Sequence, residues 1–259
     1  MRTVWVREPC SKEHDYRGRV NVYLMEQSRA DVPSDNDWLS ANDVACLNGM
    51  RFEKRRTDWR LGRWTAKRAL AAYLGSPMDA RSLAMIEIRP EPSGAPVAFV
   101  VGKPANAEIS LSHRDGTALC AIAQSGAALG CDIEVVEARS DAFVTDYFTA
   151  VEQEFISNTN PQSRSQLLAL LWSAKESVLK TLRVGLRVDT RSLTVEPARD
   201  PVPLFHPSHT DEWHSFNVQF AADQVFQGWW QHAATRVRTV VAIPSPSRPI
   251  LLTEHMLDF

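Results

Sequence analysis

Two short motifs carry the side chains best suited to chemistry. LGCDIE at 129–134 places Asp132 and Glu134 two residues apart in an apolar stretch, and LWSAKES at 171–177 adds Glu176 further along the chain. In a strand, residues i and i+2 point to the same face, so both carboxylates would share one face of a sheet. Three carboxylates near a core are costly unless a hard cation such as Mg²⁺ binds them. The two motifs therefore indicate a candidate metal site.

Lysines accompany the third carboxylate. Lys175 and Lys180 flank Glu176 on a helix that the periodicity predicts over 163–183. Glu176 and Lys180 are i,i+4 neighbours, which on an ordinary surface helix add only a small ion-pair stabilisation. Taken alone, a surface pair on the helix and a polar strand end at Asp132 are the simpler interpretations. Combined, the acids and lysines favour a metal site that receives a phosphate-bearing substrate.

The elements that must position these residues form an α+β pattern. The 259 residues are 44% hydrophobic and 23% charged, which fits one large domain or two smaller ones. Gly185 follows the last periodic residues of the second motif's helix and is expected to cap it in the left-handed conformation. Helical periodicity covers 37–74, 141–157 and 163–183, whereas strand patterns cover 20–25, four stretches within 84–134 and four more within 192–243.

An internal repeat divides the chain. WTAKR at 64–68 matches WSAKE at 172–176, and ARSL at 80–83 matches TRSL at 190–193 at nearly the same offset, each at the start of an expected strand. Two matched words in the same order indicate duplicated architecture.

We therefore expect a pseudo-dimer of two similar αβ halves, 1–125 and 126–259, with the active site in the cleft between them. Arg68 stands where the second half has Glu176. This difference predicts that the first half captures phosphate and that the second half binds metal.

The combined motifs resemble the signature of the 4′-phosphopantetheinyl transferases. The pattern is G-x-D-x-E followed by W-S-x-K-E-x-x-x-K, with Ser110-Leu111-Ser112-His113 resembling a further S-x-S-H element of that family. The matching residues are Gly130, Asp132, Glu134, Trp172, Ser173, Lys175, Glu176 and Lys180. Length, the repeat and a basic helix resemble the large, monomeric class that activates nonribosomal peptide and polyketide synthases.

The resemblance implies a reaction and a set of roles. The 4′-phosphopantetheine arm of coenzyme A would pass to a serine of an apo acyl or peptidyl carrier protein, leaving 3′,5′-ADP. Mg²⁺, with Mn²⁺ as an alternative, would be held by Asp132, Glu134 and Glu176. Glu176 could also deprotonate the serine, and Lys180 would stabilise phosphoryl charge. The residues expected to bind coenzyme A are Arg56, Arg63, Lys67, Ser112, His113, Lys175 and Lys180.

The expected phosphate contacts draw on a basic segment. Within 51–68, Arg56, Arg60, Arg63 and Lys67 recur on one helical face. A solvated basic face is the simpler interpretation for any one of them, and guanidinium forks suit phosphate oxygens. The family's usual G-[K/R]-P element has two imperfect counterparts, Gly94-Ala95-Pro96 and Gly102-Lys103-Pro104. Either Lys103 substitutes for the usual cation, or that contact is lost.

Composition narrows the function classes. The formal charge of −2 and the absence of a recognisable motif argue against a nucleic-acid partner. No apolar run reaches membrane-spanning length, the start of the chain lacks a signal-peptide pattern, and four scattered cysteines suit a reducing compartment. We therefore expect a cytoplasmic monomer without a membrane partner. The histidines of HPSHTDEWH at 206–214 lack a regular scaffold, so zinc is not expected there.

Two alternatives stay open. A non-catalytic coenzyme A or nucleotide-binding protein of the same fold would be indicated by loss of an acid, yet all three acids are present. A Mg²⁺-dependent phosphodiester hydrolase would turn over coenzyme A without an acceptor protein. The carrier protein is expected to dock near 137–160, where Phe143, Val144, Tyr147 and Phe148 recur, although such residues are more often core.

Overall fold

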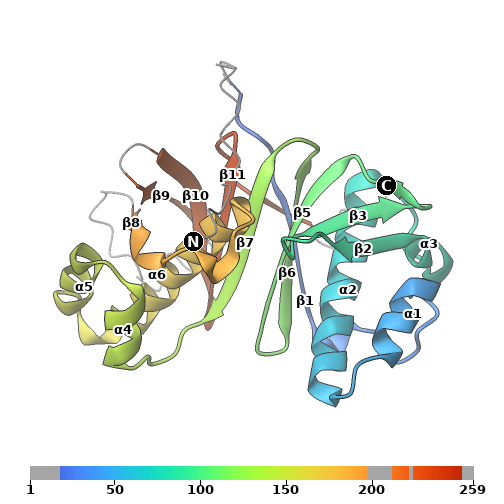
Figure 1. The fold of residues 1–259 in the computed structure, drawn as a ribbon, viewed down its shortest axis with the longest axis horizontal. Helices are drawn as coiled ribbons and strands as arrows, with labels where there is room; N and C mark the ends of the chain where they lie inside the picture. Colours follow the sequence, from blue (N-terminus) through green and yellow to red (C-terminus); the bar gives the residue numbers. More distant parts are fainter. Residues whose placement is uncertain (1–17, 198–211, 222–223, 253–259) are drawn as a thin grey trace, which may run out of the picture.

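The computed structural model describes residues 18–197, 212–221 and 224–252, and in that part the protein is α+β (Figure 1). A first sheet has the order β12-β1-β6-β5 and a second has the order β7-β11-β10-β9-β8. A small antiparallel sheet, β2-β3-β4, lies beside the first. In the described part, no helix is long and apolar enough to cross a membrane.

The first part of the chain supplies the small sheet, three strands of the first sheet and the three α-helices α1–α3, while β12 from the end of the chain completes the first sheet. The long helix α2 follows the shorter α1 and ends at Gly75, whose φ of 62° gives the left-handed cap that glycine favours. The element bounds are β1 Tyr23–Ser28, α1 Ala41–Asn48, α2 Glu53–Leu74, α3 Ala80–Ala84, β2 Ile86–Pro90, β3 Pro96–Val100, β4 Lys103–Pro104, β5 Ala107–Arg114 and β6 Thr117–Gln124.

The second part supplies the five-stranded sheet and its covering helices. The long helix α6 begins with Pro161 behind the N-cap Asn160, an arrangement that suits the orphan amides of a first helical turn. The element bounds are β7 Ala128–Val135, α4 Asp141–Tyr147, α5 Ala150–Ser157, α6 Pro161–Thr181, β8 Leu193–Pro197, β9 Trp213–Phe220, β10 Gln224–Ala233, β11 Arg236–Ile243 and β12 Ile250–Leu251.

Three apolar clusters define the layers. One cluster lies between α6 and the second sheet, and another lies between α2 and the first sheet. The third joins the opposite faces of the two sheets through Leu119 and Ala121 of β6, Cys131 and Ile133 of β7, and Val240 of β11. The order is therefore helix, sheet, sheet, helix, and Figure 1 shows the two long helices on opposite sides of the molecule.

Most expected elements form, with two corrections at their ends. ARSL lies in the short helix α3, which precedes β2. In TRSL, Thr190–Ser192 form a 3₁₀ turn and only Leu193 begins a strand, β8. Gly185 is not the cap of α6. The helix ends at Thr181, and Arg183 takes the left-handed conformation with φ 56° while its amide bonds to the Lys180 carbonyl.

Candidate active site

Asp132 occupies the seam between the two sheets. Its Oδ1 accepts a hydrogen bond of 2.7 Å from Ser112 Oγ on β5 and one of 2.8 Å from Lys180 Nζ on α6. The residue is only 4% exposed, and its Oδ2 is buried without a hydrogen-bond partner among the described residues. A buried carboxylate oxygen without a partner is costly. This oxygen is therefore well suited to bind a cation or a ligand group.

The strand alternation explains how the acids reach this seam. Cys131 and Ile133 pack into the apolar layer between the sheets, so Asp132 and Glu134 point to the opposite face, toward α6. Burial also raises the pKa of the Cys131 thiol to about 11, which leaves it an inert core residue. The predicted division of β7 into an acidic face and an apolar face is thus confirmed.

Gly130 allows α6 to approach β7 closely. A Cβ at this position would lie 2.0 Å from the carbonyl oxygen of Ser177 and 2.6 Å from Thr181 Oγ1. Both contacts are far shorter than carbon and oxygen atoms tolerate, so a side chain would push the helix away. The glycine of the G-x-D-x-E motif therefore sets the spacing between the strand that carries Asp132 and the helix that carries Glu176.

The other two acids are held close enough to Asp132 to feel its charge. Burial, and then the Asp132 carboxylate, raise the pKa of Glu176, while Lys180 opposes the shift. Burial and Asp132 likewise raise the pKa of Glu134, against the effects of Arg114 and Arg139. Although burial alone would lower it, the pKa of Lys180 is raised, with Asp132 as the leading cause. Such like-charge crowding favours a bound cation.

The three carboxylates nevertheless do not converge into a formed metal centre. No group of three or more His, Cys, Asp or Glu side chains in 18–197, 212–221 and 224–252 is placed to hold a metal ion. Protein cations neutralise the acids instead: Lys180 pairs with Asp132, and Arg139 lies 3.1 Å from Glu134. The oxygen donors and the orphan Asp132 Oδ2 fit a hard divalent cation in kind. The arrangement of the donors in the structure does not itself form the site.

A basic cleft adjoins this seam at His113. The histidine is exposed at the end of β5 and lines two neighbouring hollows of about 460 and 530 Å³. Lys54 borders both hollows, Arg55 borders the first, and Arg114 borders the second. Acids line the hollows as well: Asp58 borders both, and Asp115 and Glu137 border the second, where Arg114 pairs with Glu137. The cations supply donors that suit phosphate groups.

Two of the lysines expected to bind coenzyme A instead form buried ion pairs. Lys67 and Lys175 are fully buried and pair with Asp43 at 2.6 Å and with Glu152 at 2.7 Å. Both ammonium groups are thus enclosed in the protein interior and line neither of the two hollows. The sequence pattern placed these lysines on helices, but it did not show that an acid from a preceding short helix covers each one.

The predicted basic face of α2 also points away from His113. Arg56 donates to the Leu47 carbonyl at 2.9 Å, and Arg63 lies 3.7 Å from Asp43 and stacks over Trp59. The face therefore packs against α1, and Arg56 and Arg63 line neither of the two hollows. Ser112 and Lys180 do meet at Asp132, and His113 does face a basic cleft.

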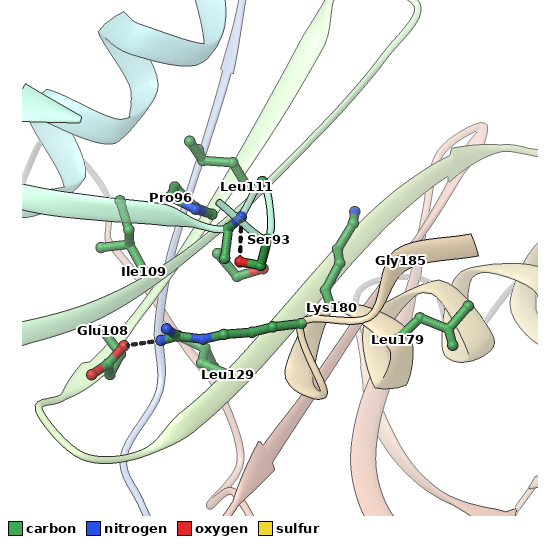
Figure 2. Close-up of a pocket in the computed structure, with 13 residues that line it drawn as sticks. Ser93, Pro96, Glu108, Ile109, Leu111, Leu129, Leu179, Lys180 and Gly185 are labelled. Atoms are coloured by element: carbon green, nitrogen blue, oxygen red, sulfur yellow. Dashed lines mark hydrogen bonds and ion pairs between the residues drawn. The ribbon is translucent and has the colours of Figure 1, made fainter. Parts of the chain in front are cut away.

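A smaller cavity of about 220 Å³ lies on the other side of the seam (Figure 2). Leu179 and Lys180 contribute from α6, while Pro96, Ile109 and Leu111 contribute from the strands of the first part. Gly94-Ala95-Pro96 lines this cavity, whereas Lys103 lies exposed on β4 and does not. Arg183 closes one end by pairing with Glu91 and Glu108.

The expected docking segment is mainly core. Phe148 is fully buried, Val144 is nearly so, and Phe143 packs against the apolar cluster under α6. The exposed apolar residues of this segment are Tyr147, Val151 and Phe155. His206 and His209 lie outside the described residues.

Sequence reasoning missed the residues that hold the acids in place. Arg114 and Arg139 clamp Glu134 and also pair with Glu137 at 2.6 and 3.1 Å. Lys54 and Arg55, rather than Arg56, line a hollow together with His113. A helical wheel that excluded the face packed on α1 would have selected Lys54 and Arg55, but the chain offers no local signal for that packing.

Comparison with known proteins agrees with the motifs. Residues 128–234 match the family model of the 4′-phosphopantetheinyl transferase superfamily. This matched segment contains Asp132, Glu134, Glu176 and Lys180. No curated protein matches the sequence.

Two solved structures are distantly similar. A holo-(acyl-carrier-protein) synthase from Bacillus anthracis in complex with CoA (3′,5′-ADP) shares 19% identity, with a TM-score of 0.34, over 41% of this chain and 97% of its own. Helicobacter pylori holo-[acyl-carrier-protein] synthase in complex with coenzyme A shares 16% identity, with a TM-score of 0.32, over 40% and 99%.

Proposed function

We propose that this protein transfers the 4′-phosphopantetheine arm of coenzyme A to a serine of an apo acyl or peptidyl carrier protein, releasing 3′,5′-ADP. The observation that carries the proposal is the meeting of Ser112, Asp132 and Lys180 at one seam, and the match of residues 128–234 to the 4′-phosphopantetheinyl transferase model supports it. The hollows at His113, the residue after Ser112 at the end of β5, carry cations suited to the phosphates of the donor.

The residues divide the work of the reaction. The serine oxygen of the carrier forms a bond to the phosphorus that bears the pantetheine arm, and the bond from that phosphorus to the 3′,5′-ADP oxygen breaks. Glu176 takes the proton of the serine, directly or through water, because its buried carboxylate favours protonation. Lys180 stabilises charge on the phosphoryl oxygens.

Asp132, Glu134 and Glu176 would hold Mg²⁺, and Mn²⁺ accepts the same oxygen donors. When bound, the cation would neutralise charge on the pyrophosphate and on the leaving 3′,5′-ADP. Lys180, Arg139 and Arg114 would then turn from the acids toward the substrate oxygens. The proposal draws support from the orphan Oδ2 of Asp132.

The same proposal includes an architecture. Lys67 and Lys175 sit in matching positions of α2 and α6, each paired with an acid of a short preceding helix. This correspondence supports a pseudo-dimer of two αβ halves, 1–125 and 126–259, and membership of the large monomeric class that serves nonribosomal peptide and polyketide synthases. The first half would bind the phosphates of coenzyme A, and the second would carry the metal ligands.

The test is the release of 3′,5′-ADP from coenzyme A, followed by chromatography with Mg²⁺ present. We expect release only when an apo carrier protein is added. Release without a carrier would identify a phosphodiester hydrolase instead. Binding of coenzyme A without release, across several carriers, would identify a non-catalytic binding protein.

A further inference from the structure

A buried ion pair is formed by the residue that precedes Glu176 on α6. Lys175 Nζ lies 2.7 Å from Glu152 Oε2, and the two side chains are 0% and 1% exposed. The ammonium also donates to the carbonyl oxygens of Tyr147 at 3.1 Å and Thr190 at 2.9 Å. One lysine of α6 thus holds the end of α4, the start of α5 and the turn before β8.

The acid of the pair is equally well bonded. Glu152 Oε1 accepts from the Val195 amide of β8 at 2.8 Å, and Oε2 accepts from the Thr149 amide at 2.8 Å. Buried ion pairs are seldom net stabilising compared with apolar side chains, because desolvating both charges is expensive. The single orientation that this pair imposes on α6 therefore explains its presence better than a gain in stability does.

Two contacts connect the pair to the site. Lys175 precedes Glu176, and the helical step of about 100° per residue turns Glu176 and Lys180 to a neighbouring face of α6. The pair also holds Tyr147, whose ring packs edge-on against Trp172 of α6 at 5.1 Å. The rotation of α6 in turn sets where Glu176 and Lys180 lie.

The other half of the molecule contains a matched pair. Lys67 lies 2.6 Å from Asp43 and donates to the carbonyl oxygens of Trp38 and Leu83. Asp43 and Glu152 each occupy the third position of a helix with a capping box. The difference lies in the next residue, since Lys67 precedes Arg68 and Lys175 precedes Glu176.

We infer that Glu152 and Lys175 are positioning residues for the transfer reaction: they fix the rotation of α6 that presents Glu176 and Lys180 to Asp132. This role rests on the proposed function. The Asp43–Lys67 pair provides the same anchoring for α2, which carries no acid at the equivalent position. It is therefore a control of similar burial that is already present in the chain, with the difference that Asp43 also lies 3.7 Å from Arg63.

The experiment compares Glu152→Gln with Asp43→Asn in the full chain. Both variants leave a buried lysine without its acid, so both are expected to unfold at lower temperature. At a temperature where both are folded by circular dichroism, Glu152→Gln is expected to lower kcat about 10- to 100-fold with the KM for coenzyme A unchanged, as misplaced catalytic groups do. Asp43→Asn is expected to keep the wild-type kcat.

A double variant, Glu152→Gln with Lys175→Met, distinguishes the misplacement of α6 from the loss of folding stability. The double variant no longer buries an unpaired charge, so its unfolding temperature should return toward that of the wild type while its kcat stays low. A folded double variant with wild-type kcat would overturn the positioning role, as would equal kcat losses in Glu152→Gln and Asp43→Asn. A wild-type protein that transfers nothing would instead reject the proposed function, and the positioning role with it.

Discussion

Ser112 on β5 donates a hydrogen bond of 2.7 Å to Asp132 on β7, joining the edges of two separate sheets. A second bond also joins the two strands, since the Cys131 amide of β7 donates to Ser110 Oγ of β5 at 3.0 Å. The two serines of the S-x-S-H element therefore hold the strand of the first acid, and His113 follows at the mouth of the basic cleft. The seam between the sheets and the candidate active site are the same place.

Replacing Asp132 tests the centre of the site. Asp132→Asn keeps the size of the side chain and an oxygen for Ser112, but it removes the charge that faces Lys180. We expect the transfer rate to fall on the order of 100-fold or more, because the variant lacks the Asp132 carboxylate charge in the buried site where charge develops in the transition state. Ser112→Ala should cost less, since it removes a neutral bond. Initial rates with saturating coenzyme A measure both, and equal rates for Asp132→Asn and wild type would exclude Asp132 from the chemistry.

Glu176 should control the acid side of the pH profile. Burial and Asp132 raise its pKa, so the ionised base disappears at a higher pH than for an ordinary glutamate. We expect kcat/KM to fall on acidification through that raised pKa, and Glu176→Gln to lower kcat by about 100- to 10,000-fold, the range of general-base catalysis. Rate profiles at fixed ionic strength measure this. A Glu176→Gln variant with the wild-type profile would contradict the base role.

The same shifts predict how stability depends on pH. Glu134 and Glu176 have pKa values raised in the folded state, so their contribution is fully present below the ordinary glutamate pKa and is lost as pH rises through the raised values. The metal-free protein should therefore lose thermal stability over that window, and Glu134→Gln with Glu176→Gln should flatten the dependence. Added Mg²⁺ should restore stability near neutral pH. Unfolding midpoints across pH, with and without Mg²⁺, provide the measurement.

The basic cleft should act on donor binding. Lys54→Ala and His113→Ala remove cations or donors that face the hollows at the end of β5. We expect each to raise the KM for coenzyme A several-fold with kcat little changed, and more so at low salt, because exposed charges are screened. Arg81→Ala, an exposed residue of α3, serves as the control. If all three variants have the same KM, the donor does not bind in this cleft.

Gly130 should tolerate no side chain. Gly130→Ala places a methyl group against the Ser177 carbonyl oxygen, so α6 must move or the core must distort. Overpacking of this kind costs about 1–3 kcal/mol, and backbone atoms yield less than side chains do. We expect a lower unfolding midpoint together with lost transfer, because the acids of β7 and α6 separate. Ala127→Gly, a small change on the turn before β7, is the comparison that should leave transfer intact.

The sequence predicted which strand and helix carry the residues of the candidate site, but not which segments pack around them. Period-two alternation in β7 separated Asp132 and Glu134 from Cys131, and the 3.6-residue period predicted the apolar side of α6. Both patterns are local. They identify which face of a helix or strand is buried, but not which other segment packs against that face.

The two lysines illustrate the limit. A helical wheel places Lys67 and Lys175 next to their polar neighbours, but only the fold brings Asp43 and Glu152 against them. One signal was available: Ser40-x-x-Asp43 and Thr149-x-x-Glu152 are capping-box patterns at similar distances before the two matched motifs. Extending the internal repeat upstream would have paired each lysine with its acid.

The central claim is that this protein moves a phosphopantetheine group onto a carrier serine, and the intact mass of the carrier tests it most directly. An apo carrier protein is incubated with the full chain, coenzyme A and Mg²⁺, in parallel with a carrier whose acceptor serine is changed to alanine. We predict that the apo carrier gains the mass of one phosphopantetheine and that the alanine carrier gains none. Unchanged masses for every apo carrier tested, with a folded protein and Mg²⁺ present, would contradict the account.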